Sequence, residues 1–108
     1  PQNTIDYYAA ATKTAGGNVA DYFRLFLIPG MDHCGLSLQP GPGITESGFD
    51  PLSALEKWVE QGIAPDSLLA TKTGADGKPR WTRPICAHPK QPRYKAGEPK
   101  EASSYACE

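Results

Sequence analysis

The stretch that decides the fold is FRLFLI, which occupies residues 23–28 and is followed by Pro29 and Gly30. Five of its six side chains are apolar, and only Arg24 is charged. A short, nearly continuous apolar run bounded by turn residues is typical of a strand buried on both faces, as parallel strands in α/β proteins are. We therefore predict a buried strand over Phe23–Ile28 in a protein of the α/β class.

The residues before this strand carry the pattern of a helix over residues 4–13. Asn3 or Thr4 can cap its N-terminus, and Gly16 with Gly17 can end it. One face of this helix has the spacing needed to pack against a sheet. That face consists of Ile5, Tyr8, Ala9 and Thr12.

The residues after the strand predict a long loop over residues 30–50, and loops of this length are usually functional or disordered. Asp50 and Pro51 then open a second helix, with Asp50 as the N-cap and Pro51 in the first turn, and Gly62 ends it. The apolar stripe of this helix consists of Leu52, Leu55, Trp58 and Val59.

The last part of the chain predicts a β-hairpin and an irregular tail. Ser67–Thr73 and Arg80–Arg83 flank the Gly-rich turn 74–78, as two hairpin strands would. From Pro84 to Glu108 little periodicity remains, so we expect this tail to wrap a surface.

Composition limits the size and the partners of the protein. The chain has 108 residues, 11 glycines, 11 prolines and a formal net charge of -1. A balanced charge excludes an electrostatic nucleic-acid binder, which needs a basic surplus. No apolar run approaches the roughly 20 residues that cross a bilayer, so we expect neither a nucleic acid nor a membrane as partner. The chain lacks an initial Met, and we expect it to be a piece of a larger protein.

Three cysteines, Cys34, Cys86 and Cys107, cannot all pair within one chain. A disulfide between Cys86 and Cys107 would close a loop of about 20 residues and stabilise by about 3 kcal/mol. Cys34 then needs a partner elsewhere in an oxidising compartment. The alternative is a reduced cytosolic protein with three unrelated thiols.

His33 follows the predicted strand, where an α/β sheet presents reactive groups. A histidine in this place can take a proton from a nucleophile and return it to a leaving group, but it can equally be a structural or surface residue.

A zinc site is a rival interpretation, since Cys34, Cys86, Cys107, His33 and His88 are possible ligands. No ligand pair has zinc-site spacing, so we expect no metal site in this chain. His33 and Cys34 as a nucleophile pair would require a geometry that adjacent residues rarely reach.

Three stretches together resemble the tannase and feruloyl esterase family, which includes the mono(hydroxyethyl) terephthalate hydrolases. They are residues 22–34 (YFRLFLIPGMDHC), 54–66 and 82–86, and residues 1–8 resemble the family's segment that follows the catalytic Asp. The resemblance covers the whole chain. It implies the C-terminal portion of an α/β-hydrolase core, with residues 1–108 as one segment of the catalytic domain.

The resemblance also implies roles for individual residues. His33 would be the catalytic histidine of a Ser-His-Asp mechanism, acting on esters of aromatic acids such as gallate or feruloyl esters. Cys34 would form a disulfide to a cysteine outside this chain, next to the nucleophilic serine. Cys86 and Cys107 would form the family's C-terminal disulfide. The whole enzyme would be secreted or periplasmic.

Several parts of such an enzyme are missing from this sequence. No G-x-S-x-G motif occurs, and the acid residue, the oxyanion hole and the lid domain with its possible calcium site would lie elsewhere. We therefore expect the isolated 108 residues to be inactive, and the remainder of the same hydrolase to be their partner. The alternative is a small, secreted, disulfide-stapled binding module. His88, Arg80, Arg83 and Lys90 are expected at the surface, and Trp58 and Trp81 in packing roles.

Overall fold

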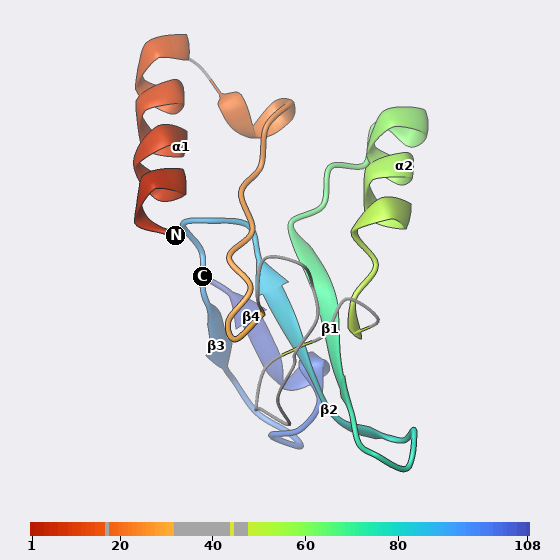
Figure 1. The fold of residues 1–108 in the computed structure, drawn as a ribbon. Coiled ribbons are helices and arrows are strands. Elements are labelled where there is room, and N and C mark those ends of the chain that lie inside the picture. Colours follow the sequence, from red (N-terminus) through yellow and green to blue (C-terminus); the bar gives the residue numbers. More distant parts are fainter. Residues whose placement is uncertain (17, 32–43, 45–47) are drawn as a thin grey trace.

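Two α-helices and two antiparallel strand pairs form the regular structure of the described residues, which are 1–16, 18–31, 44 and 48–108 of a computed structural model (Figure 1). The elements follow the chain in the order α1 (Gln2–Ala15), η1 (Val19–Asp21), α2 (Pro51–Gln61), β1 (Ser67–Thr73), β2 (Pro79–Cys86), β3 (Pro92–Tyr94), η3 (Ala102–Ser104) and β4 (Tyr105–Cys107). Strand β1 pairs with β2, and β3 pairs with β4. Helices and strands in this arrangement form a fragment of an α/β fold, as expected.

Helix α2 begins and ends where the sequence predicts. The side chain of Asp50 accepts a hydrogen bond from the backbone N–H of Ser53 at 3.0 Å. Pro51 takes the first helical position, where its missing N–H costs nothing. Gly62 ends the helix in the left-handed conformation, with φ 70°. These are local interactions, and for that reason the sequence alone could predict them.

Helix α1 is longer than predicted and starts without a side-chain cap. The carbonyl of Pro1 accepts hydrogen bonds from the N–H groups of Thr4 and Ile5, so Thr4 lies inside the helix and does not cap it. Gly16 ends the helix with φ 62°, as predicted. Among the described residues, the inner face packs on Phe23: the ring centres of Tyr8 and Phe23 lie 5.1 Å apart.

The β1–β2 hairpin carries the core. In β1, Leu68 and Ala70 are buried, whereas Leu69 between them is 58% exposed. Across the register, Leu68 pairs with Ile85, which is 5% exposed. Strand β2 runs to Cys86, beyond the predicted end at Arg83, because β1 continues to pair with it. The alternation of buried and exposed residues is what a sheet with one covered face requires.

The prediction of a buried strand over Phe23–Ile28 is wrong, because in the described structure these residues form no regular strand. Only Phe26 is bridged, in antiparallel fashion, to Ala87, and the backbone N–H of His88 donates to the carbonyl of Leu25. A ladder needs a partner strand along its length, and among the described residues this segment has a single bridge. The helices nevertheless lie on either side of it, since Phe23 contacts α1 and Arg24 contacts α2.

The tail from Pro92 to Glu108 folds as the pair β3–β4. A disulfide joins Cys86 at the end of β2 to Cys107 in β4, with the two Cα atoms 5.6 Å apart. The prediction of this disulfide is confirmed. It ties the last strand of the chain to the hairpin that carries the core.

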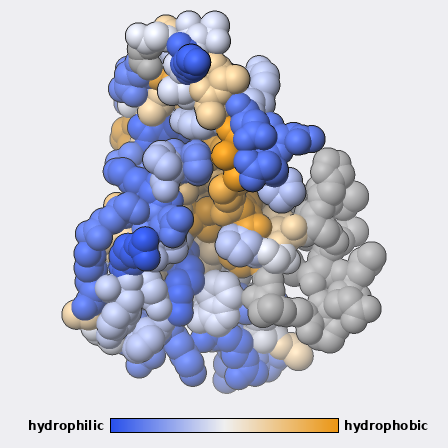
Figure 2. Space-filling model, turned by 90° about the vertical axis from the view of Figure 1, so that its left-hand side faces the viewer, coloured by the Kyte–Doolittle hydropathy of each residue, from blue (hydrophilic) through white to orange (hydrophobic). Residues whose placement is uncertain are grey.

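Much apolar surface stays exposed on this fold. Figure 2 shows hydrophobic residues gathered in the middle of one face of the molecule. Most of the predicted apolar stripe of α2 is exposed to solvent: Leu52, Leu55 and Val59 are 63%, 52% and 77% exposed. The radius of gyration is 15.0 Å, whereas a compact domain of this length has about 13 Å. The described residues therefore bury only a small core of their own.

Candidate active site

The segment that leads to His33 is held by the hairpin core. Phe26, Ile28 and Met31 pack against the buried cluster of Ile44, Leu68, Ala70 and Ile85. His33, Cys34 and the neighbouring Asp32 lie outside the described residues. The structure thus shows what supports the chain up to Met31, two positions before His33.

Ile44 is a core residue that the sequence analysis missed. It stands in the predicted long loop but is only 4% exposed, and Phe49 packs against the same cluster. The chain therefore reaches the same hydrophobic cluster twice, once before residue 32 and again at Ile44. A signal was present in the sequence, because Ile44 is an apolar β-branched residue in a stretch of glycine, proline and polar residues.

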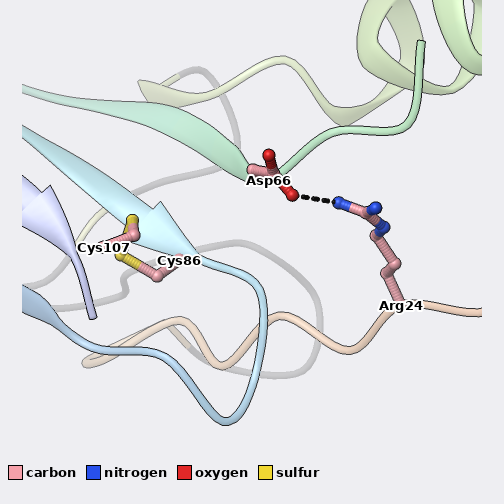
Figure 3. The surroundings of a disulfide bond; sticks show 4 residues. All are labelled: Arg24, Asp66, Cys86 and Cys107. Carbon is pink, nitrogen blue, oxygen red and sulfur yellow. Dashed lines mark hydrogen bonds and ion pairs between the residues drawn. A yellow bond between two sulfur atoms is a disulfide. The ribbon is translucent and has the colours of Figure 1, made fainter. Parts of the chain in front are cut away.

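Arg24 connects this segment to α2 and to the start of β1. Figure 3 shows its ion pair with Asp66, which directly precedes β1. Its guanidinium makes three hydrogen bonds and one ring contact. The contacts are Nε to the carbonyl of Ala20 at 2.9 Å, Nη1 to the carbonyl of Pro65 at 2.7 Å, Nη1 to Oδ1 of Asp66 at 2.6 Å, and Cζ to the ring centre of Trp58 at 5.6 Å. The Arg24 side chain is only 14% exposed, whereas that of Asp66 is 78% exposed.

His88 is half-buried, although we expected it at the surface. The ring centres of His88 and Tyr8 lie 5.9 Å apart in an edge-to-face arrangement. The backbone N–H of His88 donates a hydrogen bond to the carbonyl of Leu25. Through these contacts, His88 packs between α1 and the segment that precedes His33.

Arg83 is also not the solvated charge that the sequence predicts. Its guanidinium lies 4.2 Å from the ring centre of Tyr105 and 5.7 Å from that of Trp81, and Nη1 donates to the carbonyl of Thr82. The tail brings Tyr105 over β2, and this placement explains why Arg83 is half-buried. Arg80, by contrast, is exposed and forms an ion pair with Asp76.

An open, largely apolar groove of about 820 Å³ lies beside the segment before His33. Leu27 and Pro29 come from that segment, and Ile5 comes from α1. The rest of the lining comes from Ile44, from residues of β2 and from residues 88–92. Within the described part of the chain, no three His, Cys, Asp or Glu side chains are grouped as a metal site would need. No helix there is long and apolar enough to span a bilayer.

A carboxyl group beside the loop has a shifted pKa. The hydrogen bonds that the Ser53 side chain and backbone donate to Asp50 lower the pKa of that carboxyl below its ordinary value of 3.8. The charged form of Asp50 is therefore the one that caps α2.

Comparison with known proteins decides the family. The family model described as tannase and feruloyl esterase matches residues 1–108, which is the whole chain. The chain belongs to the tannase and feruloyl esterase family. Its sequence is 41% identical over 110 residues to a probable feruloyl esterase of Arthroderma benhamiae, covering 99% of this chain and 20% of that protein. It is 40% identical over 108 residues to the mono(2-hydroxyethyl) terephthalate hydrolase of Piscinibacter sakaiensis, covering 97% of this chain and 17% of that protein.

The fold agrees with that of solved members of this family. The crystal structure of feruloyl esterase B from Aspergillus oryzae superposes on 98% of this chain with a TM-score of 0.76 and 26% identity, and the match covers 24% of that chain. The chain thus spans about a fifth of the length of the curated relatives that it matches.

Proposed function

We propose that the complete protein hydrolyses carboxylic esters of aromatic acids through an acyl-serine intermediate, and that His33 is its catalytic histidine. The observation that carries this proposal is the match of the tannase and feruloyl esterase family to the whole chain, including the His-Cys motif at residues 33–34. The nucleophilic serine, the acid residue, the oxyanion hole and the lid domain belong to parts of the protein outside residues 1–108.

In this mechanism, His33 accepts the proton of the serine hydroxyl as the serine attacks the ester carbonyl. It then donates that proton to the leaving alcohol, and repeats both steps with water to release the acid. An imidazole suits both directions of transfer because its ordinary pKa lies close to neutrality. A single triad residue is not a catalyst, so residues 1–108 alone are inactive.

Cys34 forms a disulfide to a cysteine next to the serine, and this bond sets the separation of the serine and His33. The disulfide Cys86–Cys107 supports a location outside the cytoplasm, because disulfides persist in secreted and periplasmic proteins. The names of the relatives, a probable feruloyl esterase and a terephthalate monoester hydrolase, support aromatic-acid esters as the substrate class.

Substitution of His33 in the complete protein tests the proposal, with His88 as the matched control. His33→Ala should lower kcat for methyl ferulate by about 10³-fold or more while the circular dichroism spectrum stays unchanged. His88→Ala removes the other histidine of this chain and should keep kcat within about twofold, since His88 packs on Tyr8. Near wild-type turnover of His33→Ala would overturn the proposed mechanism, whereas a complete wild-type protein without esterase activity would favour the non-catalytic binding module.

The Cys34 disulfide has its own test. Peptide mapping without reduction should recover the peptide with Cys34 joined to the peptide that holds the nucleophilic serine, and reduction should separate them. A free thiol at Cys34 would contradict the proposed link.

A further inference from the structure

Arg24 is the charged residue that interrupts the apolar run Phe23–Ile28, and the proposed chemistry does not use it. Its side chain is 14% exposed, so its guanidinium has lost most of its contact with water. A cation in such a place requires hydrogen bonds in the protein to compensate for that loss. Arg24 has three of them and a ring contact to Trp58.

These contacts join the two sides of the stretch that contains His33. Arg24 precedes that stretch, whereas Trp58 lies on α2 and Asp66 precedes β1, both after it. A second set of contacts makes the same connection. The backbone N–H of Ala87 donates to the carbonyl of Asp66, and Ala87 forms an antiparallel β-bridge with Phe26. The chain that leads to His33 is thereby fixed to the elements that follow it.

The directional hydrogen bonds of Arg24 matter more than its charge. The ion pair with Asp66 adds little, because Asp66 is 78% exposed and solvent screens the pair. The bonds to the carbonyls of Ala20 and Pro65 need donors that point in different directions from one rigid plane. A guanidinium has this geometry, and a lysine ammonium on its flexible stem lacks it.

We infer that Arg24 is a positioning residue, which sets the place of His33 by locking the segment that carries it against α2 and the start of β1. The inference rests on the proposed function, in which His33 transfers protons during ester hydrolysis. Proton transfer depends on alignment, so a small displacement of the histidine lowers turnover without weakening substrate binding.

The test measures kcat and KM for methyl ferulate on the complete protein, at a temperature where circular dichroism shows it fully folded. Arg24→Met should lower kcat by about tenfold to a hundredfold, with KM unchanged within about twofold. Arg24→Lys should recover only part of the lost kcat. Asp66→Asn should keep kcat within about twofold, because both carbonyl acceptors remain.

Arg83→Met is the matched control. It also removes a half-buried guanidinium that lies over aromatic rings, but these rings belong to Tyr105 in the tail and to Trp81 in β2. A loss of kcat in Arg24→Met that is absent from Arg83→Met supports the positioning role. Equal kcat losses in both variants, or a rise in KM with kcat unchanged, overturn it.

Two further variants keep the test decisive. If Arg24→Met does not fold, Arg24→Gln and Arg24→Lys are compared with Arg83→Met by the same criteria. His33→Ala in the same assay separates the two proposals. Activity in His33→Ala refutes the proposed mechanism, whereas an inactive His33→Ala with a normal kcat in the Arg24 variants refutes only the positioning role.

Discussion

Removal of the disulfide Cys86–Cys107 should loosen the tail and leave the hairpin core intact. The two cysteines are 21 positions apart, and closing a loop of this length restricts the unfolded tail by about 3 kcal/mol. The paired substitutions Cys86→Ala and Cys107→Ala remove the link and place no polar group at Cys86, which is 6% exposed. Since about 1.4 kcal/mol corresponds to a factor of ten, local opening of the tail should become about a hundredfold more frequent.

Amide hydrogen exchange on the complete protein measures this opening residue by residue. The reporters are the N–H groups of Lys95 and Glu108, which bond to Ser104 and Gln91 across the β3–β4 pair. Both should exchange about a hundredfold faster in the double variant, and the amide of Ala70 in β1 should not change. Unchanged exchange at Lys95 and Glu108 would refute the view that the disulfide holds the tail.

Two other predictions follow from the core and from the cap of α2. Ile85→Ala should lower the free energy of unfolding by about 2–4 kcal/mol, because Ile85 is only 5% exposed. Leu69 is 58% exposed, so Leu69→Ala should lower it by less than about 0.5 kcal/mol. Equal losses of the two variants in urea unfolding would contradict the assigned core. Asp50 has a lowered pKa in the folded protein, so its contribution to stability is complete above 3.8 and is lost as the pH falls through the lowered value. Asp50→Asn should lack this acid dependence in unfolding experiments; an identical dependence in both proteins would show that the cap charge contributes nothing.

Local interactions explain why much of the fold could be predicted from the sequence. The cap of α2 involves Asp50 and Ser53, three residues apart, and the turn of the hairpin is closed by a hydrogen bond between Gly74 and Lys78. The disulfide could be predicted because an irregular tail with two cysteines needs a covalent link to stay folded. The family motif at residues 22–34 could be recognised because it is contiguous.

Interactions between distant segments account for the errors. Phe23–Ile28 has the composition of a buried strand, but a strand also needs partners along its edges, and the described residues supply one bridge to Ala87. The apolar stripe of α2 was predicted from its spacing alone, and Val59 in it is 77% exposed, because burial depends on what lies opposite the helix.

By itself, the sequence determined both ends of α2, the C-terminal end of α1, the hairpin turn, the tail disulfide and the family, since each depends on neighbouring residues or on a contiguous motif. Only the tertiary structure decided that Arg24 bonds to Pro65, 41 positions away, that Ile44 enters the core and that Arg83 stacks on Tyr105. Side-chain type limits which contacts a residue can make. Which of those contacts form depends on the segments that folding brings within bonding distance, and no local pattern contains that information.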